Sequence, residues 1–231
     1  MKVVILQSNY VPWKGYFDLI HDADVFVFYD EVQYTKNDWR NRNRIYTKNG
    51  LQWLTIPVNK EAVNGKISEV KISPEWQDLH FKSLYLGYKS APYFSQLDEL
   101  INDYLVNKKW DSLKDLNQYL IKRISGLLGI KTQFLDSANY TLSGDKIEKL
   151  IDLVGQVGGS EYISGPSGMN YLSDAHHLFE EKKIKLTFKK YPEFLPYKQL
   201  KEPFENAVSI LDLIAHVPYS EIGKYIWGNC N

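Results

Sequence analysis

Arginine recurs at alternate positions in one short polar stretch of the chain. Arg40, Arg42 and Arg44 follow Trp39, and Asn41 stands between the first two arginines. Alternate residues of an extended segment point to the same side, and a guanidinium binds a phosphate through two parallel hydrogen bonds. The stretch is therefore either a phosphate-binding loop or a charged loop in solvent. We favour a phosphorylated, stackable ligand such as a nucleotide sugar, because an indole adjoins the arginines in the sequence.

A second group of polar and aromatic residues follows two apolar runs, 3–6 and 25–29, which we expect to be buried strands joined by a helix. Strands joined in this way run parallel, so their carboxyl ends meet at one edge of a sheet. The side chains just past these ends should then share one crevice. We expect seven of them to bind substrate: Gln7, Asn9, Tyr10, Trp13, Tyr16, Asp30 and Gln33.

A glycine-containing turn, Ser164-Gly165-Pro166-Ser167-Gly168, lies between an expected strand and an expected helix. Its glycines allow the backbone to approach a ligand closely, and the helix amino end behind it suits a phosphate or carboxylate. The turn matches neither a Walker motif nor a dinucleotide-binding fingerprint. It is therefore either a phosphate-binding loop or a tight strand-to-helix turn.

His80 is the candidate general base. It shares a stripe of four-residue spacing with Trp76, Leu84 and Tyr88 in the expected helix 74–89. A neutral imidazole near pH 7 can take a proton from an amine or a hydroxyl, although the same pattern also fits a histidine of the core or its rim. No spacing of histidine or cysteine indicates a metal site, and no Gly-x-Ser-x-Gly motif supports a serine hydrolase.

Composition narrows the class of protein. Lys plus Arg and Asp plus Glu both number 28, so the net charge is zero, which argues against nucleic acid as a partner. The one cysteine, Cys230, excludes an internal disulfide and fits a reducing compartment. Without a long apolar segment behind Met1, or any run of about eighteen apolar residues, we expect a cytoplasmic protein with no membrane insertion.

Short strands alternate with helices, which predicts one α/β domain over residues 1–231 with a mainly parallel, twisted sheet and flanking helices. We expect 35–50 to be a polar loop and 74–128 to form a helical lobe at one edge. The expected strands are 3–6, 25–29, 53–58, 67–72, 132–135, 161–163 and 184–188. The expected helices are 13–22, 74–89, 102–128, 145–156, 170–182 and 208–216.

Five segments of the chain resemble the WbqC-like family. They are ILQSNYVPWKGYFDLI, DVFVFYDEVQYTKNDWRNRNRI, WLTIPV, YISGPSG with Tyr171 behind it, and FENAVSILDLI. Members of this family lie among bacterial genes for O-antigen and other surface polysaccharides, so the resemblance implies work on a nucleotide-linked sugar. It also implies that Tyr171 binds substrate together with Ser164, Gly165 and Pro166.

We therefore expect a transferase of lipopolysaccharide sugar biosynthesis that moves an N-acyl or aminoacyl group to the amine of a nucleotide-linked amino sugar. The acyl donor would be a thioester, on the phosphopantetheine of an acyl carrier protein or on coenzyme A, and no cofactor is expected to stay bound. Arg40, Arg42 and the turn 164–168 would bind phosphates, Trp39 would stack on the ligand, and His80 would deprotonate the amine.

Two alternatives remain open at this point. The first is an ATP-dependent ligase or nucleotidyltransferase-like enzyme on the same fold, although Trp13-Lys14-Gly15-Tyr16 stands where the His-x-Gly-His signature of such enzymes would be. The second is a non-catalytic accessory protein that binds a sugar nucleotide. The sequence also leaves open the sugar, the acyl group, the use of ATP and whether the chain forms a homo-oligomer.

Overall fold

Five strands form the central sheet of the computed structural model, which describes residues 1–59 and 64–228, so that Cys230 lies outside the described residues. The strand order is β5-β2-β1-β6-β7, and each neighbouring pair runs parallel. The prediction of an α/β fold with a mainly parallel sheet is confirmed. The strands are β1 Lys2–Leu6, β2 Val25–Phe28, β5 Gln133–Asp136, β6 Glu161–Ser164 and β7 Lys185–Phe188.

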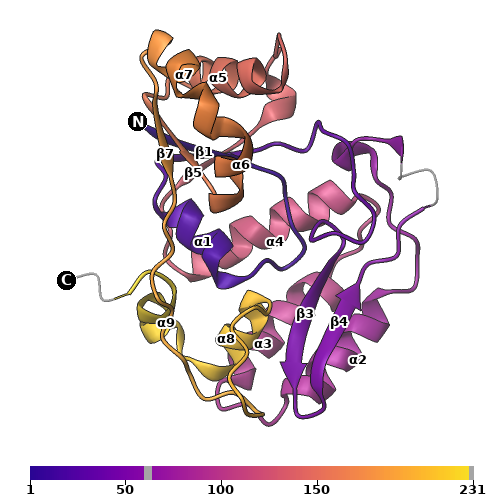
Figure 1. Cartoon of the computed structure of the whole chain (residues 1–231). Coiled ribbons are helices and arrows are strands. Elements are labelled where there is room, and N and C mark those ends of the chain that lie inside the picture. The colour runs from indigo at the N-terminus through magenta and orange to yellow at the C-terminus, as the bar shows by residue number, and fades with distance from the viewer. Residues whose placement is uncertain (60–63, 229–231) are drawn as a thin grey trace.

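Helices cover both faces of the sheet (Figure 1), which explains why its central strands are apolar throughout. Val4 and Phe26 pack on one side with α1 and α4, whereas Val3 and Val25 pack on the other side with α5 and α7. Each fully buried side chain of this size contributes about 1.5 to 3 kcal/mol. The covering helices are α1 Lys14–His21, α4 Leu113–Leu127, α5 Lys146–Gln156 and α7 His176–Glu181.

A hairpin stands apart from the sheet where we expected a polar loop. Strands β3, Arg42–Thr47, and β4, Gly50–Thr55, pair in antiparallel fashion and form their own two-stranded sheet, beside α2 in Figure 1. The prediction of a loop over 35–50 is therefore wrong from Arg42 onward. The strand predicted over 53–58 is present in part, as the end of β4, but it belongs to the hairpin and not to the parallel sheet. Ile45 and Leu54 face the core, but the charged and polar residues that begin β3, Arg42, Asn43 and Arg44, obscured the alternation that marks a strand.

Two further predicted elements differ from the structure. The expected strand 67–72 contains the 3-10 helix η2, Ile67–Glu69, because its buried side chains, Ile67 and Val70, are spaced by three residues rather than two. The expected helix 102–128 is broken, since the Ser112 hydroxyl accepts a hydrogen bond of 3.2 Å from the Asp115 N–H and begins α4 anew.

The remaining helical elements lie outside the central sheet or in its connections. The expected helix 170–182 is divided among α6, η6 and α7, and α9 was not expected. No helix within residues 1–59 and 64–228 is both long and apolar enough to cross a lipid bilayer. These elements are α2 Gln77–Tyr88, α3 Phe94–Ile101, the π-helix η3 Asn102–Val106, η4 Ser137–Asn139, η5 Pro166–Gly168, α6 Met169–Leu172, η6 Ser173–Ala175, α8 Ile210–His216 and α9 Tyr219–Ile226.

His80 links α2 to two other parts of the chain inside the core. It is 2% exposed, with Nδ1 2.9 Å from the Tyr10 hydroxyl and Nε2 3.1 Å from the Thr55 carbonyl oxygen. The carbonyl can only accept, so Nε2 carries the proton and the Tyr10 hydroxyl donates to Nδ1. Burial lowers the pKa of His80 to about 4, which keeps the imidazole neutral at physiological pH.

The buried imidazole makes the stability of the fold depend on pH. Because the pKa of His80 is depressed from 6.5 to about 4, its contribution is complete above pH 6.5 and is lost as the pH falls towards 4. The wild type should therefore lose roughly 3 kcal/mol more free energy of unfolding between pH 7 and pH 4 than H80Q, which has no titrating ring. Urea unfolding of both proteins across this range measures the difference. If the free energy of unfolding falls equally with pH in both proteins, protonation of the His80 ring does not destabilise the fold.

Candidate functional site

A crevice lies where the strand order of the main sheet reverses. Counted along the chain within that sheet, the order is 3-2-1-4-5, and β1 pairs with β2 on one side and β6 on the other. Doubly wound folds bind ligands at the carboxyl ends of the strands flanking such a reversal. Here a cavity of about 420 Å³ opens between Leu6 at the end of β1 and Ser164 at the end of β6.

Arg40 is held in this crevice by two neutral amide side chains. Its Nη1 donates to Asn9 Oδ1 at 3.1 Å and its Nη2 to Gln7 Oε1 at 3.0 Å. Asp38 is the nearest carboxylate, 3.6 Å away and itself partly exposed. The amides orient the guanidinium without neutralising it, so its positive charge and its remaining N–H groups stay available for an anion.

Lys146, the first residue of α5, brings a second positive charge to the crevice. Its Nζ lies 4.0 Å from the centre of the Tyr171 ring, a cation–π distance that fixes the ammonium at the rim. Among the described residues that line the crevice there is no Asp or Glu. The site is therefore electropositive, although the whole chain has a net charge of zero.

The turn after β6 forms the opposite wall and depends on a glycine. A Cβ on Gly168 would lie 2.0 Å from the Ser164 hydroxyl oxygen, so a larger residue there would force this hydroxyl to rotate, and the Gly168 N–H donates to the Gly165 carbonyl at 2.9 Å. Gly165 itself has no neighbour that a Cβ would strike. Its missing side chain therefore leaves open space on the crevice wall.

Aromatic rings supply the other surfaces. The Trp13 indole lies over Gly15, whose added Cβ would come within 2.3 Å of the ring, and meets Tyr191 edge-on at 5.2 Å between centroids. Trp39 is 42% exposed and forms an outer wall. Burial raises the pKa of Tyr191 to about 12, so its phenol stays protonated and can donate to a hydroxyl or phosphate.

The turn that carries Asn9 and Trp13 is strained and tightly clamped. Val11 has φ +36°, which is unfavourable for a β-branched residue. Asn43 Nδ2 donates to the carbonyl oxygens of Tyr10 and Val11 at 3.1 and 2.9 Å, and the Ser209 hydroxyl donates to that of Val11 at 2.7 Å. The hairpin and the segment before α8 thus fix this wall of the crevice.

The structure brings most of the expected binding residues together, and these line the crevice: Gln7, Asn9, Trp13, Tyr16, Trp39, Arg40, Ser164, Gly165, Pro166 and Tyr171. Six other expected residues do not line it: Tyr10, Asp30, Gln33, Asn41, Arg42 and His80.

All six have other surroundings that the structure defines. Tyr10 and His80 form the buried link described above. Asp30 is fully buried and accepts hydrogen bonds from the Ser8 N–H and Gln118, and Asn41 is buried against the Ile56 carbonyl.

Arg42 stacks on Trp53, 4.3 Å from the ring centre. Gln33 is exposed and makes an isolated β-bridge to Lys66.

Among the described polar and aromatic lining residues, four were not predicted from the sequence: Tyr29, Lys146, Tyr162 and Tyr191. Lys146 was detectable, because it follows the helix cap Asp145 and helices of α/β folds begin near the carboxyl ends of the strands. Tyr29 directly follows β2 but was assigned to the strand. Tyr191 lies in an irregular segment with no pattern that predicts its position.

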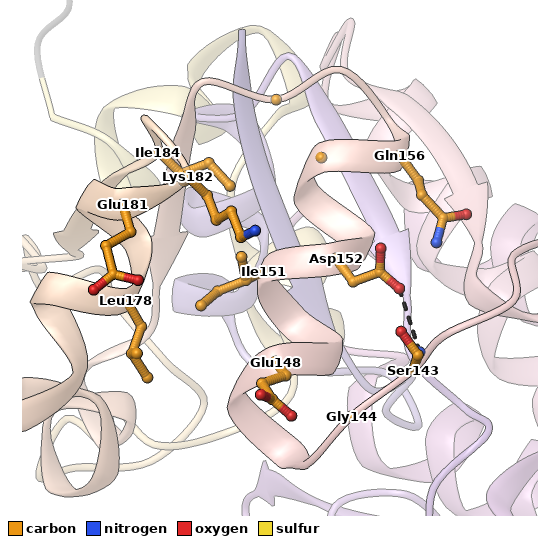
Figure 2. A pocket seen from close by; sticks show the side chains of 12 residues that line it. Ser143, Gly144, Glu148, Ile151, Asp152, Gln156, Leu178, Glu181, Lys182 and Ile184 are labelled. Carbon is orange, nitrogen blue, oxygen red and sulfur yellow. Dashed lines mark hydrogen bonds between the residues drawn. The ribbon is translucent and has the colours of Figure 1, made fainter.

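A larger hollow, of about 850 Å³, lies between α5 and α7 (Figure 2) but shares no residue with the crevice. Two of its three described lining carboxylates have structural partners. Glu148 accepts from the Asp145 N–H at 2.8 Å in the cap of α5, and Asp152 accepts from the Ser143 N–H at 3.3 Å. Volume alone therefore does not identify the functional site.

The clamp on the strained turn yields a stability prediction. N43A should lower the free energy of unfolding by about 2 to 4 kcal/mol, because the Tyr10 carbonyl and the Arg44 N–H lose the Asn43 side chain as partner and the Val11 carbonyl keeps only the Ser209 hydroxyl. N41A is the matched control and should cost less, since Asn41 makes one such bond, to Ile56. Urea unfolding at neutral pH compares them; equal losses would mean that the turn holds its shape without Asn43.

Comparison with known proteins agrees with the resemblance inferred from the sequence. The model of the WbqC-like protein family matches residues 7–223, which include both walls of the crevice. The chain is also 43% identical over 218 residues to the uncharacterized protein Rv1507c of Mycobacterium tuberculosis, with 94% of each chain covered. No solved structure matches it. Because the family match spans nearly the whole sequence, the chain belongs to the WbqC-like protein family.

Proposed function

We propose that this protein binds a nucleotide-linked amino sugar in the crevice between β1 and β6 and transfers an acyl or aminoacyl group to its amine. One observation carries the binding half of the proposal. The crevice at the reversal of strand order combines two cations, Arg40 and Lys146, with aromatic walls, and no Asp or Glu is among its described lining residues. This composition suits a diphosphate flanked by groups that stack.

The shape of the crevice is consistent with such a ligand. A volume of about 420 Å³ lies within the usual range of small-molecule sites. In our proposal the phosphates contact Arg40 and Lys146, and the open wall at Gly165 admits the chain that links them. Trp13 and Tyr171 offer ring faces to the base and the sugar.

The chemical half of the proposal rests on the family resemblance to proteins of surface-polysaccharide gene clusters. The neutral amine attacks the carbonyl carbon of a thioester, the new C–N bond forms as the C–S bond breaks, and the leaving thiolate takes up the proton lost by nitrogen. The products are an amide and a thiol, so no covalent acyl-enzyme is required. Because His80 is buried outside the crevice, this scheme assigns it no proton transfer.

The strand order also favours a second candidate function. The same order and the same crevice position serve nucleotide-binding enzymes in general, so an ATP-dependent ligase or nucleotidyltransferase-like activity fits the sheet equally well. The two candidates differ in the ligand that should bind. A sugar nucleotide would be preferred in the first, and ATP in the second.

Binding is tested first. A thermal-shift screen of dTDP-, UDP-, GDP- and CDP-linked sugars against ATP should identify a sugar nucleotide that stabilises the protein. R40Q should weaken its affinity by roughly 10- to 100-fold, since a charge-assisted bond to phosphate is lost, whereas K48Q, at the exposed hairpin turn, should not. A rise in melting temperature with ATP alone would favour the second candidate. No shift with any ligand of the panel would contradict both candidates.

Transfer is tested with the sugar nucleotide so identified. Incubation with acetyl and glycyl thioesters of phosphopantetheine or coenzyme A should give an amide, detected by mass spectrometry, together with one equivalent of free thiol. S167W, which places a bulky ring on the exposed crevice wall, should abolish both binding and product. Binding without product from any donor would instead support an accessory protein.

The same transfer assay tests whether His80 takes part in the reaction. If H80Q lowers turnover a hundredfold or more while its affinity for the sugar nucleotide is unchanged, His80 takes the proton from the amine.

A further inference from the structure

A second pocket adjoins the crevice and shares one wall with it. It has a volume of about 310 Å³ and includes Pro12, Asn43, Arg44 and Ala207. Both cavities are bounded by the same three side chains, Asn9, Trp13 and Trp39. The two cavities are therefore adjacent, and one of the shared side chains, Trp39, is 42% exposed and is not held in the core, so it can leave the two ligands in contact past its edge.

The polar groups of this second pocket are mostly engaged. Both N–H groups of the Asn43 amide hold the strained turn, and its oxygen accepts from the Arg44 N–H at 2.8 Å. The Asn9 side-chain oxygen accepts from Arg40. What remains to meet a ligand is a largely apolar surface made by Pro12, two indoles and the Ala207 methyl group.

Arg44 is the exception. Its Nη2 donates to the Ala207 carbonyl at 2.8 Å, but its Nε is buried and has no hydrogen-bond partner in the part of the chain that the structure describes. No ion pair to an acid is formed by this guanidinium among the described residues. A guanidinium has five N–H donors; one bonds to the Ala207 carbonyl and the Nε–H is buried, which leaves the three others, on the two terminal nitrogens, for an anion.

We infer that this pocket holds the phosphopantetheine arm of the acyl donor, an inference that rests on the proposed acyl transfer. The arm is a slender chain of methylene and methyl groups interrupted by two amides and one hydroxyl, with a phosphate at one end. The chain fits the apolar surface, and the phosphate fits Arg44. Its thioester then reaches the shared wall, where the amine of the sugar in the crevice attacks the carbonyl carbon. The C–S bond breaks, and the thiolate leaves with the amine's proton.

The arrangement keeps the two substrates in separate compartments. The sugar nucleotide is recognised through Arg40 and Lys146, and the donor through Arg44, so each phosphate group has its own cation. Neither substrate needs to leave before the other binds. Saturation of one pocket should consequently leave the affinity of the other ligand nearly unchanged.

The test uses phosphopantetheine and its dephosphorylated form, pantetheine, in calorimetric titrations of the full-length protein. The wild type should bind phosphopantetheine about tenfold more tightly than pantetheine, and R44Q should abolish this preference, because Gln can still bond to the Ala207 carbonyl but carries no charge. K48Q removes one charge from the turn of the same hairpin outside both pockets and should keep the preference.

Two blocking variants locate the ligands independently. A207F fills the second pocket from an exposed position and should weaken phosphopantetheine at least tenfold without affecting the sugar nucleotide. S167W should do the opposite. Phosphopantetheine binding that survives A207F but is lost in S167W would place the arm in the crevice and overturn the inference.

The remaining outcomes separate this inference from the proposed function. A protein that binds the sugar nucleotide but not phosphopantetheine contradicts the second site and leaves the first one standing. The protein could instead prefer phosphopantetheine to pantetheine, lose this preference in R44Q, and bind no sugar nucleotide. That outcome contradicts the proposed acceptor and supports the second site.

Discussion

The bond between the Asn43 amide and the turn after β1 is the constraint on which both pockets depend. Val11 occupies a conformation that costs a β-branched residue of the order of 1 to 3 kcal/mol, and it persists because Asn43 and Ser209 both bond to its carbonyl oxygen. Without these two hydrogen bonds, the turn would relax to a less strained conformation, and Asn9 and Trp13 would move with it. The strain is thus what directs an amide and an indole into the same wall.

This dependence explains why the hairpin is not an accessory to the sheet. It holds the turn through Asn43, brings Trp53 against Trp39, and presents Arg44 to the second pocket. The start of α8 completes the clamp, with the N–H of its first residue, Ile210, donating to the Pro12 carbonyl at 2.9 Å. Because these contacts join positions up to about two hundred residues apart in the chain, no local pattern could reveal them.

The sequence predicted the sheet and the edge that carries the site, but not the direction of individual side chains. Buried strands and their order of connection follow from apolar runs, so the crevice could be located from them. Asp30 also follows a strand at that edge, yet it turns inward to accept the Ser8 N–H, and burial raises its pKa. His80 was placed on a stripe with Trp76 and Tyr88 that proved to be the core face of α2. Spacing identifies a shared face, whereas tertiary packing decides what that face meets.

The electropositive crevice likewise depends on where the acids point rather than on composition. Near the same sheet edge, Asp136 pairs with Lys114 at 2.8 Å, and on α1 Asp18 pairs with Lys189 at 2.9 Å, so both carboxylates are neutralised away from the crevice. Arg40, in contrast, is held mainly by amides. A chain of zero net charge can therefore present two cations to one ligand, although Asp38 lies 3.6 Å from Arg40. The net charge of a chain indicates whether it can bind an extended polyanion, because such a ligand contacts a large part of the surface. It does not indicate whether a diphosphate can bind, because a diphosphate contacts only a few residues.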